Sequence, residues 1–135
     1  MKVYIASKYL DHKLLNRQIY HELVQANIDA FLPESINVNA ISLDEMNAVA
    51  RICFSEIDKC NIILIVCPFG KSVSCEIGYA IAKMGISTKK KHLILLNPEH
   101  ADNILKSEAM IAPFIEKEVI NIKQLIEYLK TNDFE

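Results

Sequence analysis

The clearest indication of the fold is the stretch NIILIVCPFGKSVSCEIGYAIA, residues 61–82. It begins with an uninterrupted apolar run at residues 62–66 that is rich in β-branched side chains. Such a run is typical of a central strand in a parallel sheet that helices cover on both faces. Pro68 and Gly70 interrupt the run, and apolar residues then recur at helical spacing from Ile77 onward. The stretch therefore predicts a strand, a polar loop and a helix.

An acid, Glu76, lies near the predicted start of this helix. Ser72 and Ser74 are both favourable N-cap residues, and either start would place Glu76 in the first turn. Free backbone N–H groups and the helix dipole favour an ionised carboxylate there. Because ligands of open α/β sheets bind beyond the carboxyl ends of the strands, Glu76 is expected at the ligand-binding edge. Two interpretations stay open: a carboxylate that attacks an anomeric carbon, and an acid that only stabilises the helix.

Further apolar runs alternate with helical patterns along the rest of the chain. Strands are predicted at residues 3–6, 28–32, 62–66, 92–96 and 119–120. Strands that alternate with helices imply right-handed crossovers and a parallel sheet. The sequence therefore predicts an α/β fold, a flavodoxin- or Rossmann-like three-layer sandwich with a five-stranded parallel sheet in the order 2-1-3-4-5.

The helix boundaries follow from capping residues. Asp11 is expected to cap the first helix, Ser42 and Glu45 form a capping box for the second, and Asn121 opens the last. Residues 34–41 are predicted to form a polar loop and residues 99–111 to be weakly helical. The basic run at residues 89–91 is expected to be a solvated turn.

The predicted strand order places the turn after the first strand beside the loop at residues 67–74. Tyr4, near the end of the first strand, is positioned either to orient a carboxylate by a hydrogen bond or to fill the core. The other candidates for substrate binding come from the two loops, and they are Ser7, Lys8, Gly70, Lys71, Ser72 and Ser74. The last four either cradle a phosphate at a helix N-terminus or serve as ordinary loop and cap residues.

Composition narrows the function classes. The 135 residues are expected to form one domain, with 51% hydrophobic residues, 24% charged residues and a net charge of −2. This charge gives no reason to expect a nucleic acid polymer or a membrane as partner. The four cysteines form no CxxC pair, so reduced thiols and no metal site or other cofactor are predicted. The start of the chain is too quickly polar for a signal peptide, and a cytoplasmic location is expected.

Three segments together resemble the nucleoside 2-deoxyribosyltransferase family, which includes deoxynucleoside 5′-monophosphate N-glycosidases. They are KVYIAS at residues 2–7, DKCNIILIV at residues 58–66 and PFGKSVSCEIGYA at residues 68–80. The segments occur in the family's order and spacing, and the resemblance extends over residues 1–96.

The resemblance implies hydrolysis or transfer at the N-glycosidic bond of a (deoxy)nucleoside or its 5′-monophosphate. Glu76 would be the nucleophile that forms a covalent glycosyl-enzyme, and Tyr4 would orient it. Ser72 and Ser74 lie where family members contact the sugar or the phosphate. The resemblance also implies a homodimer or a larger homo-oligomer in which a neighbouring subunit completes the site.

Four features depart from the family pattern. Ser7-Lys8 follows the first strand where many members have a Gly or Gly-Pro, and Asn61 replaces an acid that opens the third strand. An acid expected on the second helix falls on Cys53, and an acid that the transferases have six residues before the nucleophile is Gly70. A hydrolase that recognises phosphate accommodates these residues better than a transferase, because Lys8, Lys71 and the serines could bind a phosphate. The alternative is a catalytically weak or inactive nucleotide-binding or signalling module of the same fold. Cleavage of a nicotinamide dinucleotide is a related enzymatic possibility.

Overall fold

A computed structural model describes residues 1–36, 42–100 and 103–134 of the chain and contains a five-stranded sheet. The strands are β1 (Lys2–Ala6), β2 (Asp29–Phe31), β3 (Ile62–Val66), β4 (His92–Leu96) and β5 (Ile115–Val119). All neighbouring pairs are parallel, and the order is β2-β1-β3-β4-β5, which confirms the predicted topology.

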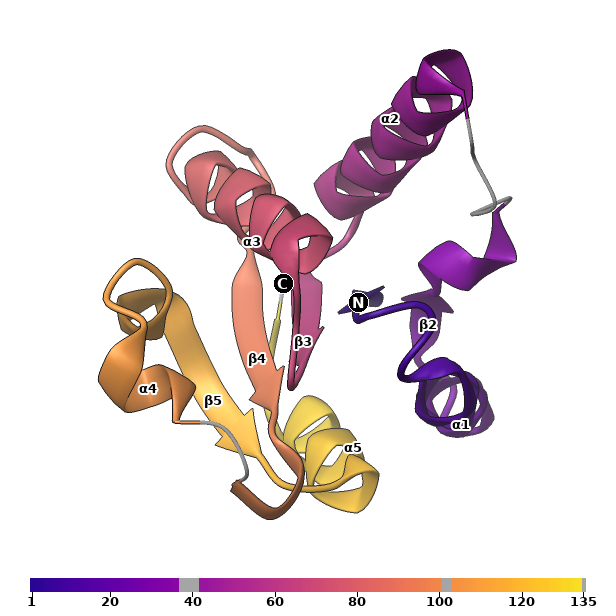
Figure 1. Ribbon diagram of the computed structural model, residues 1–135. Coiled ribbons are helices and arrows are strands. Elements are labelled where there is room, and N and C mark those ends of the chain that lie inside the picture. Colours follow the sequence, from indigo (N-terminus) through magenta and orange to yellow (C-terminus); the bar gives the residue numbers. More distant parts are fainter. Residues whose placement is uncertain (37–41, 101–102, 135) are drawn as a thin grey trace.

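Helices cover both faces of this sheet (Figure 1). The helices are α1 (Lys13–Gln25), α2 (Leu43–Lys59), α3 (Lys71–Met84), α4 (Ile104–Ser107) and α5 (Ile122–Thr131). Helices α1 and α5 pack on one face and α2 and α3 on the other, because alternate strand residues point to opposite sides. In β1, for example, Val3 and Ile5 join the core under α1 and α5, whereas Tyr4 and Ala6 join the core under α2 and α3.

Two of the predicted caps are present and two are wrong. The Ser42–Glu45 capping box opens α2, and Asn121 accepts a hydrogen bond from the Gln124 backbone at the start of α5. However, α1 begins after His12 and not after Asp11.

The N-cap of α3 is Gly70, and neither Ser72 nor Ser74 caps this helix. The hydroxyl of Ser74 donates to the Gly70 carbonyl at 3.0 Å, so it satisfies the backbone from inside the helix. As a result Glu76 is the sixth residue of α3 and lies in the second turn, where the free N–H groups of the helix end no longer reach it.

The last strand differs most from its prediction. It covers Ile115–Val119, whereas residues 119–120 were predicted. Its sequence, IEKEV, is mostly charged because β5 is an edge strand with exposed side chains, so a search for apolar runs finds only its end. Within residues 99–111 the described part of the structure has the end of a 3₁₀ helix (Pro98–His100), the short helix α4 and turns. Residues 101–102, like residues 37–41 of the predicted polar loop, lie outside the described part.

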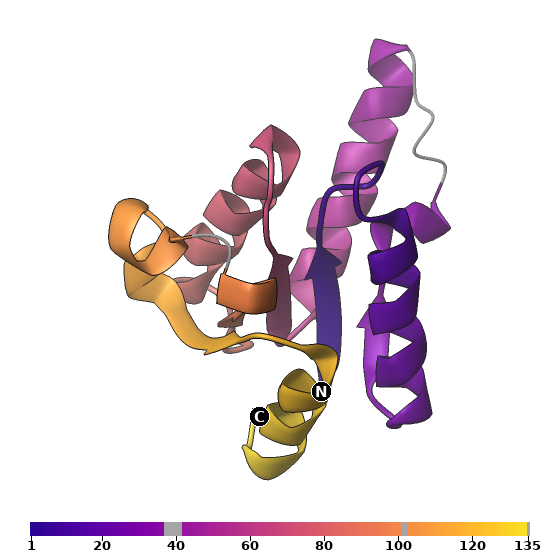
Figure 2. The same ribbon diagram turned by 60° about the horizontal axis from the view of Figure 1, so that its bottom comes forward.

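Helix α2 is longer than the sheet that it covers. Its 17 residues span about 25 Å, whereas a five-residue strand spans about 17 Å. The N-terminal turns therefore extend beyond the strands, as Figure 2 shows, and Leu43 is 81% exposed there. Farther along the helix, Cys53 and Ile57 are buried against the sheet.

The C-terminal end of α2 is held by Lys91. The ammonium group of this lysine donates to the backbone carbonyls of Ile57, Asp58 and Cys60 at 2.7–2.9 Å, and the residue is 3% exposed. The prediction of a solvated turn was therefore wrong at its last position, because a lysine suits the carbonyl-rich end of a helix. No helix in the described part of the chain has the length and apolar character needed to cross a bilayer.

Candidate active site

The side chains of Tyr4 and Glu76 meet at the carboxyl edge of the sheet. Tyr4 is fully buried in β1, and its hydroxyl donates to Oε1 of Glu76 at 2.7 Å. The strand order makes this contact possible, because β1 lies directly beside β3 and α3 follows β3 in the chain. The hydrogen bond that the position of Tyr4 suggested is therefore present.

The protonation of Glu76 is strongly perturbed. Burial raises the pKa of its carboxyl group to about 7, and the hydrogen bond from Tyr4 acts in the opposite direction. Burial and the nearby Glu76 charge also raise the pKa of the Tyr4 hydroxyl, which remains a donor at neutral pH. A carboxyl group that titrates near neutrality is suited to a role in catalysis.

Glu76 lines a pocket of about 460 Å³ between α2 and α3. The residues from α3 are Ser72, Cys75 and Glu76, and those from α2 are Met46, Val49, Ala50, Cys53 and Phe54. The α2 wall is thus entirely apolar apart from a thiol. Phe54 is fixed in place because its ring stacks on Tyr79 of α3 with the ring centroids 4.5 Å apart.

Sequence reasoning missed this α2 wall. In the sequence, Met46, Val49, Cys53, Ile57 and Cys60 recur at helical spacing, a pattern that is typical of a helix face turned to the core. Only Cys53 and Ile57 of these are buried in the helix, whereas Met46 is 50% exposed. One sequence signal could have separated the buried end of the stripe from its exposed end. The predicted helix is longer than the strands that it covers, so one of its ends must extend past the sheet.

The turn after β1 lies against the start of α3, as the strand order predicted. The side chain of Lys8 passes so close to Gly70 that a Cβ atom at this glycine would lie 3.4 Å from its Cε atom. The ammonium group of Lys8 pairs with Asp11 at 3.3 Å. The hydroxyl of Ser7 lies 3.1 Å from Nδ1 of His12. Both residues thus line the junction of the two loops but already have partners there.

The two serines of α3 face different hollows. Ser72 lines the pocket that contains Glu76, whereas Ser74 and Lys71 line a neighbouring hollow of about 390 Å³. This second hollow is bounded by Phe69 and by residues of the segment after β4, such as Ile111. Gly70 and Lys71 therefore line this second hollow and not the pocket of Glu76. The structure thus does not bring all predicted binding residues together around one pocket.

The chain was compared with protein families, curated proteins and solved structures. No protein-family model matches the sequence, and no curated protein is significantly similar to it. Solved structures do match. A 2-deoxyribosyltransferase from the psychrotolerant bacterium Bacillus psychrosaccharolyticus has a TM-score of 0.72 at 16% identity, over 95% of this chain and 92% of that protein. The chain has the fold of a 2-deoxyribosyltransferase.

Two further structures share this fold. A conserved protein from Enterococcus faecalis V583 matches with a TM-score of 0.68 and 20% identity over 97% of this chain and 98% of its own. The CMP N-glycosidase BcmB of Clostridium botulinum matches with a TM-score of 0.57 and 17% identity over the same shares. At these identities the deoxyribosyltransferase fold is shared, and the chemistry must be argued from the residues of this chain.

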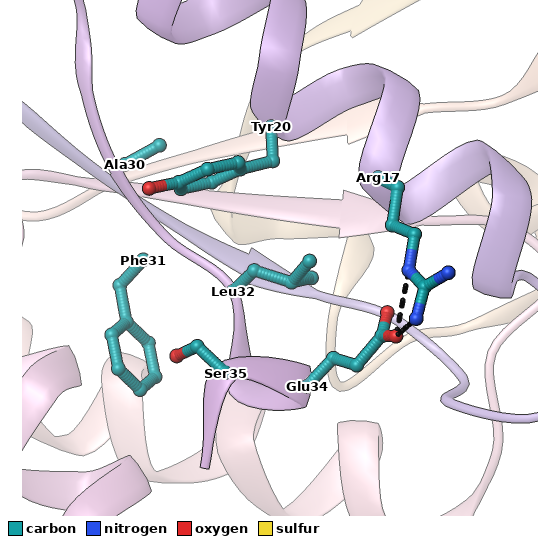
Figure 3. Close-up of a pocket in the computed structure, with 7 residues that line it drawn as sticks. All are labelled: Arg17, Tyr20, Ala30, Phe31, Leu32, Glu34 and Ser35. Atoms are coloured by element: carbon teal, nitrogen blue, oxygen red, sulfur yellow. Dashed lines mark hydrogen bonds and ion pairs between the residues drawn. The ribbon is translucent and has the colours of Figure 1, made fainter.

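A third hollow, of about 350 Å³, lies at the edge strand β2 of the deoxyribosyltransferase fold (Figure 3). Its carboxylate, Glu34, accepts two hydrogen bonds from the guanidinium group of Arg17, one of them from Nε at 2.8 Å. Phe31 lines this hollow, and its ring stacks on that of Tyr4 with the ring centroids 5.6 Å apart. The ring of Phe31 therefore lies between this hollow and the Tyr4–Glu76 pair. Because Arg17 neutralises Glu34, this hollow is a weaker candidate for chemistry than the pocket at Glu76.

The described residues contain no group of three or more side chains placed to hold a metal ion. All four cysteines are free thiols, and three of them are buried. The pocket at Glu76 is therefore the candidate active site, and its reactive group is a carboxylate.

Proposed function

We propose that the protein cleaves the N-glycosidic bond of a nucleoside or nucleotide with Glu76 as the nucleophile. The observation that carries this proposal is the 2.7 Å hydrogen bond between Tyr4 and Glu76 at the wall of a pocket beyond the strand ends. The fold supports the proposal, since one structure that shares it is named as a 2-deoxyribosyltransferase and another as a CMP N-glycosidase.

In the proposed reaction, the ionised carboxylate of Glu76 attacks the anomeric carbon C1′ of the sugar. A C1′–O bond forms while the C1′–N bond breaks, and the bonding electrons leave with the base. Water then attacks C1′ and displaces Glu76 as a carboxylate, and the proton that the water releases neutralises the departed base. Two displacements at the same carbon give retention of configuration. A second base in place of water would give transfer instead of hydrolysis.

Tyr4 is proposed to position the nucleophile. Its hydroxyl holds Oε1 of Glu76, so the carboxylate has a fixed orientation and its other oxygen can reach a substrate. Tyr4 is fully buried in β1, and this packing keeps the phenol in place during the reaction.

A second candidate function is nucleotide binding without cleavage. It is favoured by one observation: of the described residues that line the pocket, only Glu76 has a carboxylate. A general acid typically contributes about 10²–10⁴-fold to the rate, so a site that lacks one could retain affinity and lose turnover.

The test is base release from a panel of ribo- and deoxyribonucleosides and their 5′-monophosphates, measured by chromatography. We expect release by the wild type, none by Glu76→Gln, and unchanged release by the control Glu127→Gln, which alters an exposed acid on α5. Equal release by wild type and Glu76→Gln would refute Glu76 as the nucleophile. Thermal stabilisation by a nucleotide without base release would support the binding module.

A further inference from the structure

In the described part of the chain, the carboxylate of Glu76 is desolvated, and no cation contributes to its pKa. Lys8 is paired with Asp11, and Lys71 lines the neighbouring hollow. The segment that leads into α2, residues 37–41, has the sequence NVNAI and thus contains no ionisable side chain.

The described lining of the same pocket has no good proton donor for a leaving base. Of its described lining residues other than Glu76, only Cys53 and Cys75 have an ionisable group. Burial raises the pKa of the Cys53 thiol, which makes it a weaker acid than usual. The nearby hydroxyl of Tyr4 already donates its proton to Glu76. A neutral purine or pyrimidine would therefore have to leave without protonation.

We propose that the preferred substrates of this site are cationic N-glycosides, in which the glycosidic nitrogen belongs to a positively charged ring such as a pyridinium or an N7-alkylated purine. This inference rests on the proposed function and specifies its substrate class. Two features of the described residues lead to it: none of them supplies a countercharge to the carboxylate, and none that lines the pocket is a suitable acid for the leaving group.

The charge argument concerns binding. Burial of an ionised carboxylate without a partner is unfavourable, and a positive charge within about 4–6 Å favours the ionised form. A cationic ring in the pocket supplies that charge and at the same time ionises the nucleophile. The α2 wall, with Met46, Val49 and Phe54, provides an apolar surface for the flat ring.

The leaving-group argument concerns the chemical step. When Glu76 attacks C1′, a C1′–O bond forms and the C1′–N bond breaks, and the electron pair neutralises the positive ring nitrogen. No proton has to move in this step, so no general acid is needed. Water then displaces Glu76 from C1′ and releases one proton to solvent. The products are the free sugar, a neutral base and a proton.

The first test compares matched pairs of substrates at pH 7. Nicotinamide riboside is compared with uridine and cytidine, and 7-methylguanosine with guanosine. We expect kcat/KM to be at least about 100-fold higher for the cationic member of each pair, which is the contribution of a missing general acid. The two cationic substrates also distinguish a pyridinium from an alkylated purine as the preferred ring.

The outcomes separate this inference from the proposed function. Cleavage of guanosine or cytidine at a rate equal to or above that of the cationic partner would overturn the inference and leave the proposed function intact. If none of the five ribonucleosides is cleaved, the proposed function is decided by the wider panel of deoxynucleosides and 5′-monophosphates, and the preference for charge is decided by binding.

The second test measures binding of a probe that cannot be cleaved. 1-Methylnicotinamide has the cationic ring without a sugar, and nicotinamide is its neutral counterpart. By calorimetry at pH 8, we expect the wild type to bind the cation at least about 10-fold more tightly, which corresponds to about 1.4 kcal/mol. Glu76→Gln should lose this preference, and Glu127→Gln should keep it. Equal affinities in the wild type, or a preference that survives in Glu76→Gln, would overturn the inference.

A third test adds the missing acid. Ala50 lines the pocket from α2, so Ala50→Glu would place a carboxyl group on the wall opposite α3. This variant should narrow the ratio of kcat/KM between 7-methylguanosine and guanosine, whereas the isosteric control Ala50→Gln should not. An equal effect of both variants would argue against a role for the missing acid.

Discussion

Two carboxylates on the same side of the sheet, Glu56 of α2 and Glu76 of α3, have opposite surroundings. Glu56, at the amino edge of the sheet, accepts hydrogen bonds from Lys59 at 2.6 Å and from Lys2 at 2.9 Å, and these bonds lower its pKa. Glu76, at the carboxyl edge, accepts a hydrogen bond from the Tyr4 hydroxyl and has no charged partner among the described residues, and burial raises its pKa to about 7. The fold thus pairs Glu56 with two lysines, whereas Glu76 remains without a countercharge within the described part of the chain.

Replacement of each acid by its amide should separate the two roles most clearly. Glu76→Gln is expected to lower kcat/KM for base release by at least about 10⁴-fold, because an amide is a poor nucleophile. Glu56→Gln should keep wild-type turnover, since Glu56 lies at the opposite edge. A steady-state assay of both variants measures this contrast. Similar losses in the two variants would contradict it.

The two acids should also give stability opposite dependences on pH. The pKa of Glu76 is higher in the folded protein than the 4.5 of a free side chain, so the folded state binds the proton more tightly. Its contribution is therefore present below pH 4.5 and is lost as pH rises through about 7. We expect Glu76→Gln to be more stable than the wild type by about 2–3 kcal/mol at pH 8 and to lose this advantage near pH 4. Urea unfolding at the two pH values tests the prediction, and an advantage that does not change with pH would refute it.

Removal of the Tyr4 hydroxyl should alter Glu76 without removing it. Tyr4→Phe is expected to lower kcat by about 10- to 100-fold, because a hydrogen bond to a charged group contributes about 1.5–3 kcal/mol. The bond also lowers the pKa of Glu76, so its loss should move the acid limb of the pH–rate profile to higher pH. A fall in kcat with an unchanged profile would indicate only a structural effect of Tyr4.

The smallest effect is expected at Glu56. Glu56→Gln should destabilise the protein by about 1 kcal/mol at pH 7, since its lysine partners are partly exposed to solvent. The folded-state pKa of Glu56 is lowered, so its contribution is present above pH 4.5 and is lost as pH falls through the lowered pKa. The difference between variant and wild type should therefore shrink in acid and also at high salt. A difference that persists at pH 3 would show that the ion pairs are not its cause.

The sequence predicted the buried part of the fold well, because apolar periodicity reports burial. Residues 62–66 and 92–96 coincide with β3 and β4, which lie in the middle of the sheet. The same signal failed for the edge strand β5, where only Val119 is buried. Capping propensity, a different signal, failed at the start of α3, where the N-cap is Gly70 in an extended conformation and not one of the two serines.

The candidate site was only half predictable for a related reason. Tyr4 and Glu76 follow from strand order, since each lies near the carboxyl end of a neighbouring strand. The α2 wall does not follow, because an apolar stripe has the same pattern whether it faces a core or a pocket. Which residues face which space depends on how far α2 extends past the sheet, and that is a property of the assembled fold.

The distribution of thiols has a practical consequence. Cys75 is exposed and lines the pocket beside Glu76, whereas Cys53, Cys60 and Cys67 are buried. A maleimide dye should therefore attach at one position in the folded wild-type protein, with no engineering of the other cysteines. Cys75 is thus an attachment site for a fluorescent reporter beside Glu76, and the dye signal can follow the binding of a compound in the pocket.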